Sequence, residues 1–164
     1  MFRAGTMIDV VEPDLQMLHR YWLDHCNGNA LPSRAALGRL PITLPHLLPN
    51  LILVDTAAHI EDFRYRLFGS AVCQGFGHDR TGVTLGTLRE GVDNYDQIYA
   101  GYWQTYDEAR PDYFHGRIVS LAQDYKRYSR LLLPLSSDGK RVETILGGMM
   151  FFRRNQDRPT PAPA

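Results

Sequence analysis

The sequence predicts an α+β domain, in which helices and an antiparallel sheet occupy separate stretches of the chain. Two short apolar runs, at residues 51–54 and 63–68, are predicted strands, and three longer strand-like runs follow near the C-terminus. A segment with helical periodicity, residues 94–109, separates the two groups. Groups of strands interrupted by helices, without strict alternation of strand and helix, are typical of α+β folds.

Composition indicates a single globular domain. With 164 residues and 44% hydrophobic content, the chain is long and apolar enough to bury one core. Its 18 basic and 18 acidic residues cancel, so no net field attracts nucleic acid or an anionic membrane surface. No apolar run is long enough for a signal peptide or a membrane span. We therefore expect a cytoplasmic protein with no nucleic-acid and no membrane partner.

The first predicted element is a helix over residues 13–27. Pro13 suits the first turn of a helix, where its missing N–H is harmless, and Asn27 with Gly28 suits the end. This helix belongs to an expected N-terminal helical extension, residues 1–50, whose second half is rich in proline. Its wide apolar stripe must cover a sheet or pair with a second subunit, and we expect a homodimer. The predicted dimer contact consists of Val11, Leu15, Leu18 and Trp22.

The main domain is expected to span residues 51–152. Its first two strands are predicted to pair as a hairpin, and Gly69 marks the passage from the second strand into a short helix. Asp79 to Gly82 has the pattern of a further helix start, and a hairpin turn is expected at Ser136–Gly139. The three C-terminal strands are predicted at residues 113–122, 128–135 and 142–152.

The final residues, 153–164, contain alternating proline and alanine and are expected to form a disordered tail. Cys26 and Cys73 lie far apart in the sequence, without the spacing of a metal site, and are expected to be free thiols.

Four collinear pieces of the sequence resemble the single-domain PAS-like proteins of alphaproteobacteria, a family of PAS domain proteins of unknown function. The resemblance implies a PAS-like, five-stranded antiparallel sheet with helices on one face. It also implies a sensory or protein-interaction role and no reaction. The four pieces are residues 18–22 with 31–34, residues 47–51, residues 65–70 with 77–82, and residues 132–135 with 138–139.

No cofactor is expected. Haem in a PAS pocket generally needs an axial histidine on the long helix, and residues 94–109 contain none. His115, in the following strand, is more commonly a hydrogen-bonded core or surface residue than a ligand. Cys73 lacks the Asn-Cys-Arg-Phe context of a photosensory flavin domain. Nor does the chain contain the motifs of serine hydrolases, P-loop enzymes or zinc proteases.

The resemblance places a ligand pocket between the inner face of the sheet and the helices. Arg66 or Arg130 could bind a carboxylate with two hydrogen bonds. A core filled by the chain's own aromatic side chains is the alternative. The basic and aromatic run at residues 125–130 fits a strand with solvated charges better than a nucleic-acid surface. The candidate pocket residues are Tyr65, Arg66, Leu67, Trp103, Tyr106, His115, Tyr128 and Arg130.

The predicted function is a stand-alone sensor or adaptor domain that acts in signalling by binding a ligand, a protein partner or both. It has no catalytic output of its own. The alternatives are a small enzyme with a cavity of the same α+β type, and a nucleic-acid-binding module whose binding would depend steeply on salt.

Overall fold

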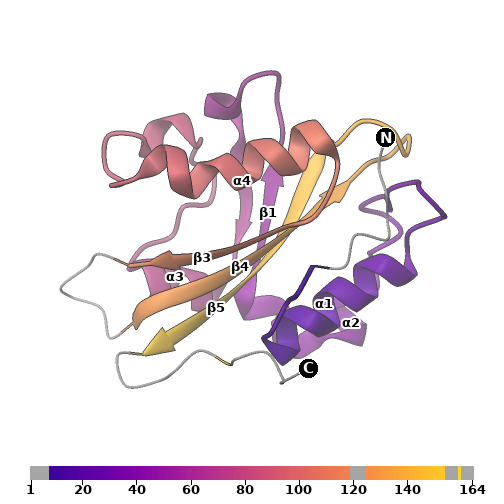
Figure 1. Cartoon of the computed structure of the whole chain (residues 1–164), viewed down its shortest axis with the longest axis horizontal. Coiled ribbons are helices and arrows are strands. Elements are labelled where there is room, and N and C mark those ends of the chain that lie inside the picture. The colour runs from indigo at the N-terminus through magenta and orange to yellow at the C-terminus, as the bar shows by residue number, and fades with distance from the viewer. Residues whose placement is uncertain (1–7, 119–124, 154–158, 160–164) are drawn as a thin grey trace.

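A five-stranded antiparallel sheet forms the centre of the protein (Figure 1). The computed structural model describes residues 8–118, 125–153 and 159. The strand order is β2-β1-β5-β4-β3, so the two predicted groups of strands meet at the β1–β5 pair and form one sheet, as expected. The strands are β1 (Leu51–Asp55), β2 (Arg64–Phe68), β3 (Asp112–Arg117), β4 (Tyr125–Leu135) and β5 (Thr144–Arg153).

The two long predicted helices are present, while one predicted helix start is wrong. Asp79 to Gly82 forms a tight turn, because the Asp79 carboxylate accepts hydrogen bonds from the backbone N–H and the hydroxyl of Thr81. The expected tail at residues 153–164 lies almost wholly outside the described residues. The helices are α1 (Pro13–Asp24), α2 (Leu40–Thr43), α3 (Ser70–Phe76) and α4 (Tyr95–Glu108), with 3-10 helices η1 (Pro45–Asn50), η2 (Ile60–Asp62) and η3 (Gly86–Leu88).

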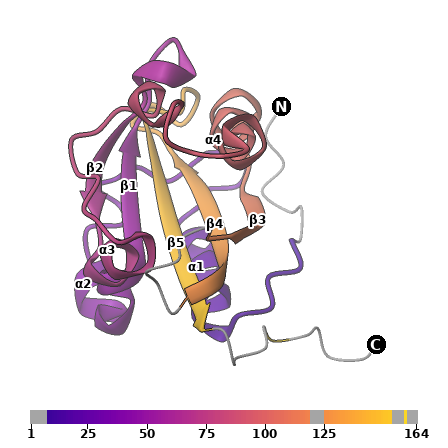
Figure 2. The same ribbon diagram turned by 90° about the vertical axis from the view of Figure 1, so that its left-hand side faces the viewer.

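Helix α1 covers one face of the sheet, opposite to the face covered by α3 and α4 (Figure 2). Leu15 and Leu18 lie directly over Gly148 of β5, where a side chain would leave no room for them. Trp22 donates a hydrogen bond from its indole N–H to the carbonyl of Pro134, at 2.9 Å.

This packing corrects the expected dimer contact. Leu15, Leu18 and Trp22 are fully buried against the sheet of their own chain, and Val11 is half-buried. The apolar stripe of α1 therefore covers the sheet of its own chain and is not available to pair with a second subunit. A partner subunit could reach these three side chains only if α1 left the sheet.

A buried carboxylate fixes the start of α1. Glu12, which precedes the helix, is 2% exposed and accepts hydrogen bonds from the hydroxyls of Tyr113 on β3 and Ser129 on β4. Burial of a carboxylate costs free energy unless hydrogen bonds compensate it, so this contact favours one position of α1 on the sheet.

Helix α4 approaches the other face of the sheet at Gly101. A Cβ atom at this position would lie 2.2 Å from Asp112 and 2.7 Å from Arg130, so only glycine allows the helix to come this close. Together with α3, the helix covers the side of the sheet on which the candidate site lies.

Candidate functional site

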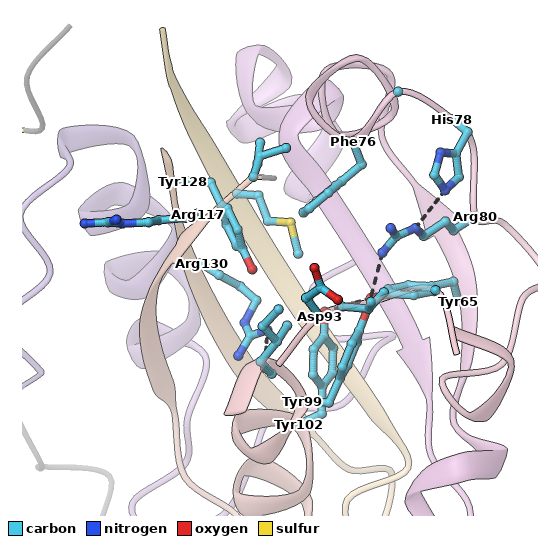
Figure 3. Close-up of a pocket in the computed structure, with 16 residues that line it drawn as sticks. Tyr65, Phe76, His78, Arg80, Asp93, Tyr99, Tyr102, Arg117, Tyr128 and Arg130 are labelled. Atoms are coloured by element: carbon cyan, nitrogen blue, oxygen red, sulfur yellow. Dashed lines mark hydrogen bonds between the residues drawn. The ribbon is translucent and has the colours of Figure 1, made fainter. Parts of the chain in front are cut away.

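A cavity of about 420 Å³ lies between the sheet, the end of α3 and the first half of α4 (Figure 3). Tyr65 of β2 and Tyr128 of β4 form part of its walls. The volume falls in the range of small-molecule pockets in proteins. The other lining residues are Phe76, Gly77, His78, Arg80, Gly91, Val92, Asp93, Ile98, Tyr99, Tyr102, Arg117, Ile118, Arg130 and Met149.

Four tyrosines, Tyr65, Tyr99, Tyr102 and Tyr128, contribute hydroxyl groups to the walls. The hydroxyls of Tyr65 and Tyr102 lie 3.0 Å apart and share a hydrogen bond. Burial raises the pKa of Tyr102 to about 12 and that of Tyr65 well above its ordinary value. Burial also raises the pKa of Tyr128. At neutral pH these hydroxyls are uncharged and can donate hydrogen bonds to a ligand.

Arg130 of β4 is the deepest charged group of the cavity walls, with 1% of its surface exposed. Its Nη1 donates to the carbonyl of Ile98 on α4, at 2.8 Å. The guanidinium carbon lies 4.6 Å from the ring centre of Tyr102 and 4.7 Å from that of Phe114, so it makes cation–π contacts with both rings. Burial opposes the charge, but attraction to Tyr102 and other neighbours outweighs it and raises the pKa of Arg130. Arg130 is therefore a permanent cation.

A second guanidinium, that of Arg80, lies nearer the solvent. Its Nη1 donates to the hydroxyl of Tyr99, at 3.2 Å, and its carbon lies 4.9 Å from the ring centre of Phe76. The carboxylate of Asp93, from an exposed loop, also lines the cavity. Figure 3 shows Arg117 extending away from the other lining side chains. The charges that face the interior are thus two guanidinium groups and one carboxylate.

Of the predicted pocket residues, Tyr65, Tyr128 and Arg130 line the cavity, whereas Arg66 and Leu67 do not. The register of β1 against β2 shifts between Leu53 and Val54, so the usual alternation of the strand is broken. Arg66 and Leu67 consequently both point to solvent. Arg66 forms an exposed ion pair with Asp55, at 2.7 Å. The assignment of Arg66 as a candidate ligand anchor is wrong.

Trp103, Tyr106 and His115 also lie outside the cavity lining. Trp103 and Tyr106 pack on the ring of Phe63, on a side of α4 that does not face the cavity. His115 lies on the exposed edge strand β3, and its Nδ1 is 3.0 Å from the hydroxyl of Ser129, which lies on the α1 side of the sheet. It therefore does not face the space where a haem or another ligand could bind.

Several cavity residues are absent from the prediction. Tyr99 and Tyr102 lie on the predicted helix, so the helical pattern could have identified them: both fall on its buried face. Arg80 and Asp93 belong to loops, where no periodic pattern indicates direction. Only the folded chain brings them to the same cavity.

The described residues offer no evident metal site. Among residues 8–118 and 125–153, no group of three His, Cys, Asp or Glu side chains is close enough to hold a metal ion. Cys26 and Cys73 are free thiols, and burial raises the pKa of Cys26 to about 11. Within the same part of the chain, no helix is long and apolar enough to span a membrane.

The fold is similar to that of a solved PAS domain. The PAS domain of BvgS from Bordetella pertussis superposes with a TM-score of 0.50 at 16% sequence identity, over 71% of this chain and 88% of that one. An RNA-binding light-oxygen-voltage receptor superposes with a TM-score of 0.48 at 14% identity, over 68% of this chain and 31% of that one. At 16% identity, the superposition on the BvgS domain shows similarity of fold alone.

We found no curated protein whose sequence matches this one. The sequence model of a PAS domain family, however, matches residues 10–150. The match extends over α1 as well as the sheet, the covering helices and the cavity between them. The chain therefore belongs to this family of PAS domains.

Proposed function

We propose that this PAS domain is a sensory module in signalling, whose input is a small molecule bound in the cavity. It has no catalytic output of its own. The response passes to a protein partner or through self-association. The observation that supports the proposal is the cavity of about 420 Å³, whose walls combine tyrosine hydroxyls with the guanidinium groups of Arg80 and Arg130.

A core filled by its own aromatic side chains would leave no such space. Interiors of proteins are close-packed, and empty cavities cost free energy in proportion to their volume. A cavity that is lined by hydroxyls and guanidinium groups is better explained as a site for a polar molecule than as a packing defect.

Native mass spectrometry of freshly purified protein tests the proposal by detecting a retained small molecule. A screen of small molecules by thermal unfolding complements it, because a ligand that binds only the folded state raises the melting temperature. We expect at least one compound to raise it, and Val92→Trp, which places a large side chain in the cavity wall, to abolish the shift.

Ile42→Trp is the matched control, because Ile42 is 74% exposed on α2 and does not line the cavity. This variant should show the same rise in melting temperature with the compound as the wild type. If the purified protein carries no molecule and no compound alters the melting temperature, the chain is an adaptor without a ligand and the proposal fails.

A further inference from the structure

Arg130 is enclosed by the fold, so the charged contacts of a ligand must come from other groups of the cavity walls. Its Nη1 is bonded to the carbonyl of Ile98, and its Nη2 faces the carboxylate of Asp112, at 3.6 Å, beneath Gly101 of α4. Nε and Nη2 have almost no accessible surface. Asp112 does not line the cavity and balances much of the charge of Arg130 from within the fold.

Arg80 is the guanidinium that a ligand in the cavity can reach. The residue is half-buried, and three contacts hold it in place. Its Nη1 donates to the hydroxyl of Tyr99, its Nε donates to Nε2 of His78 at 3.2 Å, and its guanidinium carbon lies over the ring of Phe76. Nη2 makes no hydrogen bond to any described residue, so its two N–H groups are available to an anion.

Asp93 supplies the opposite charge. It is the one carboxylate in the described lining, and it lies on the exposed loop that leads into α4. Its side chain forms no hydrogen bond or ion pair with the part of the chain that the structure describes. The carboxylate can therefore accept hydrogen bonds from a cationic group of a ligand.

Arg80 and Asp93 line the same cavity without pairing with each other. No ion pair joins these two described side chains, and Figure 3 shows both of them around one space. Two opposite charges that stay apart leave room for a molecule between them. Because the two charges cancel, a simple anion is attracted by Arg80 and repelled by Asp93, whereas a zwitterion is attracted by both.

Aromatic rings form the walls next to these charges. The rings of Phe76 and Tyr128 pack edge-to-face, with centres 5.3 Å apart, and the rings of Tyr99 and Tyr102 stack, 5.4 Å apart. Such walls favour a flat apolar body by offset and edge-to-face contacts. The cavity of about 420 Å³ is large enough for one aromatic ring and a short charged chain.

We propose that the cavity binds a free aromatic α-amino acid, with the α-carboxylate on Arg80, the α-ammonium on Asp93 and the ring among the aromatic side chains. This inference rests on the proposed function and specifies the class of ligand. The bound ring displaces water beside both ion pairs, which makes them stronger than pairs on an open surface.

Isothermal titration calorimetry tests the two charges of the ligand separately. The probes are L-phenylalanine, L-tyrosine and L-tryptophan, each with one analogue that lacks the ammonium and one that lacks the carboxylate. For phenylalanine, these analogues are 3-phenylpropionate and phenethylamine. We expect at least one amino acid to bind with a Kd below about 1 mM, and at least about fivefold more tightly than either of its analogues.

Equal binding of an amino acid and its analogue without the ammonium would indicate a simple anion site. That result would overturn the inference but would leave the proposed ligand-binding function intact. If none of the three amino acids binds, the inference is wrong, and native mass spectrometry decides separately whether another molecule occupies the cavity.

Asp93→Asn tests the contact to the ammonium. It should weaken binding of the amino acid at least about fivefold. The analogue without the ammonium should bind this variant as tightly as the wild type or more tightly, because a repelling carboxylate is removed. Asp96→Asn is the matched control, since Asp96 lies in the first turn of α4, has a side chain that is 91% exposed and does not line the cavity. It should bind the amino acid as the wild type does.

Arg80→Met tests the contact to the carboxylate and should give the complementary result. Binding of the amino acid should weaken at least about fivefold, while the analogue without the carboxylate should bind as tightly as before or more tightly. Arg66→Met is the matched control, because Arg66 lies in an exposed ion pair outside the cavity. If Asp93→Asn and Arg80→Met each weaken the amino acid and both analogues equally, the assignment of the two charged contacts is wrong.

Discussion

Gly69 lies at a point of backbone contact between β2 and the segment that precedes β1. A Cβ atom on Gly69 would lie 2.3 Å from the carbonyl oxygen of Pro49, and backbone atoms cannot move aside as a flexible side chain can. Its N–H also donates to the carbonyl of Leu51 at 2.8 Å, which holds the two segments together. This glycine is needed for the close approach.

We predict that Gly69→Ala lowers the free energy of unfolding by about 2 kcal/mol or more, because it forces the two segments apart. Urea denaturation monitored by circular dichroism measures the change. Gly91→Ala is the control, since no atom lies within 4 Å of its Cβ position and its cost should be below about 1 kcal/mol. Equal midpoints for the two variants would contradict the close contact at Gly69.

The buried tyrosines make stability sensitive to alkaline pH. Folding raises the pKa of Tyr102 from 10.0 to about 12. The protonated hydroxyl therefore makes its full contribution to stability at pH values below 10.0, the pKa in the unfolded chain. As pH rises from 10 to 12, the unfolded chain loses this proton first, so stability falls. Tyr102 alone should contribute about 2–3 kcal/mol to this loss.

We therefore expect the urea midpoint to fall steeply between about pH 10 and pH 12, where carboxylates and histidines no longer titrate. Tyr102→Phe is the comparison. It should be less stable at neutral pH, because Tyr65 loses its hydrogen-bond partner, but it should lose less stability over this pH range. If the urea midpoints of the wild type and the variant fall in parallel over this pH range, folding does not raise the pKa of Tyr102.

At the scale of elements, α1 is part of the folded core. Leu18 has no exposed surface and packs over Gly148 of β5. We predict that Leu18→Glu unfolds the domain or lowers its stability by more than about 4 kcal/mol, since it buries an unpaired charge. Met17→Glu is the control, because Met17 lies on the solvent side of the same helix and is 42% exposed.

Light scattering and circular dichroism together distinguish this outcome from a dimer contact. If Leu18→Glu keeps its secondary structure and melting temperature but halves its mass, α1 pairs with a second subunit, and its packing on the sheet would not describe the protein in solution.

The sequence predicts which segments form helices and strands better than it predicts which way their side chains point. Strands and long helices follow from local patterns: the apolar run of β1 and the helical spacing of α4 each extend over several residues. The direction of Arg66 depends on a shift in register between β1 and β2, which no local pattern indicates. The role of Arg130 depends on Ile98 and Asp112, which approach it only through the pairing of β3 with β4 and the packing of α4.

The same limit applies to α1. Its apolar stripe is evident in the sequence, but a sheet and a second subunit satisfy such a stripe equally well. The glycine at position 148 decides between them, since it lets Leu15 and Leu18 lie against β5. That pairing joins residues more than a hundred positions apart and cannot be read from either segment alone.

For the whole molecule, β4 connects the cavity with α1. Neighbouring residues of a strand point to opposite faces, so Arg130 faces the cavity while Ser129 faces α1 and donates to Glu12. A ligand in the cavity would contact β4, which contributes Tyr128 to the lining, and would hold this part of the strand in place. Because the same part of the strand carries the contact to Glu12, ligand binding should also stabilise the first turns of α1.

We predict that a saturating concentration of a ligand found by the thermal unfolding screen slows hydrogen exchange at the amides of residues 16–20, in addition to those of α4 and β4. Hydrogen exchange followed by mass spectrometry measures this protection. In Ser129→Ala the cavity face is unchanged, so the ligand should still bind and protect α4. The added protection of α1 should disappear, because the link from β4 to Glu12 is removed. If the wild-type ligand complex protects α4 and β4 but leaves α1 unchanged, the two faces of the sheet are not coupled, and the signal would leave the domain from the cavity side.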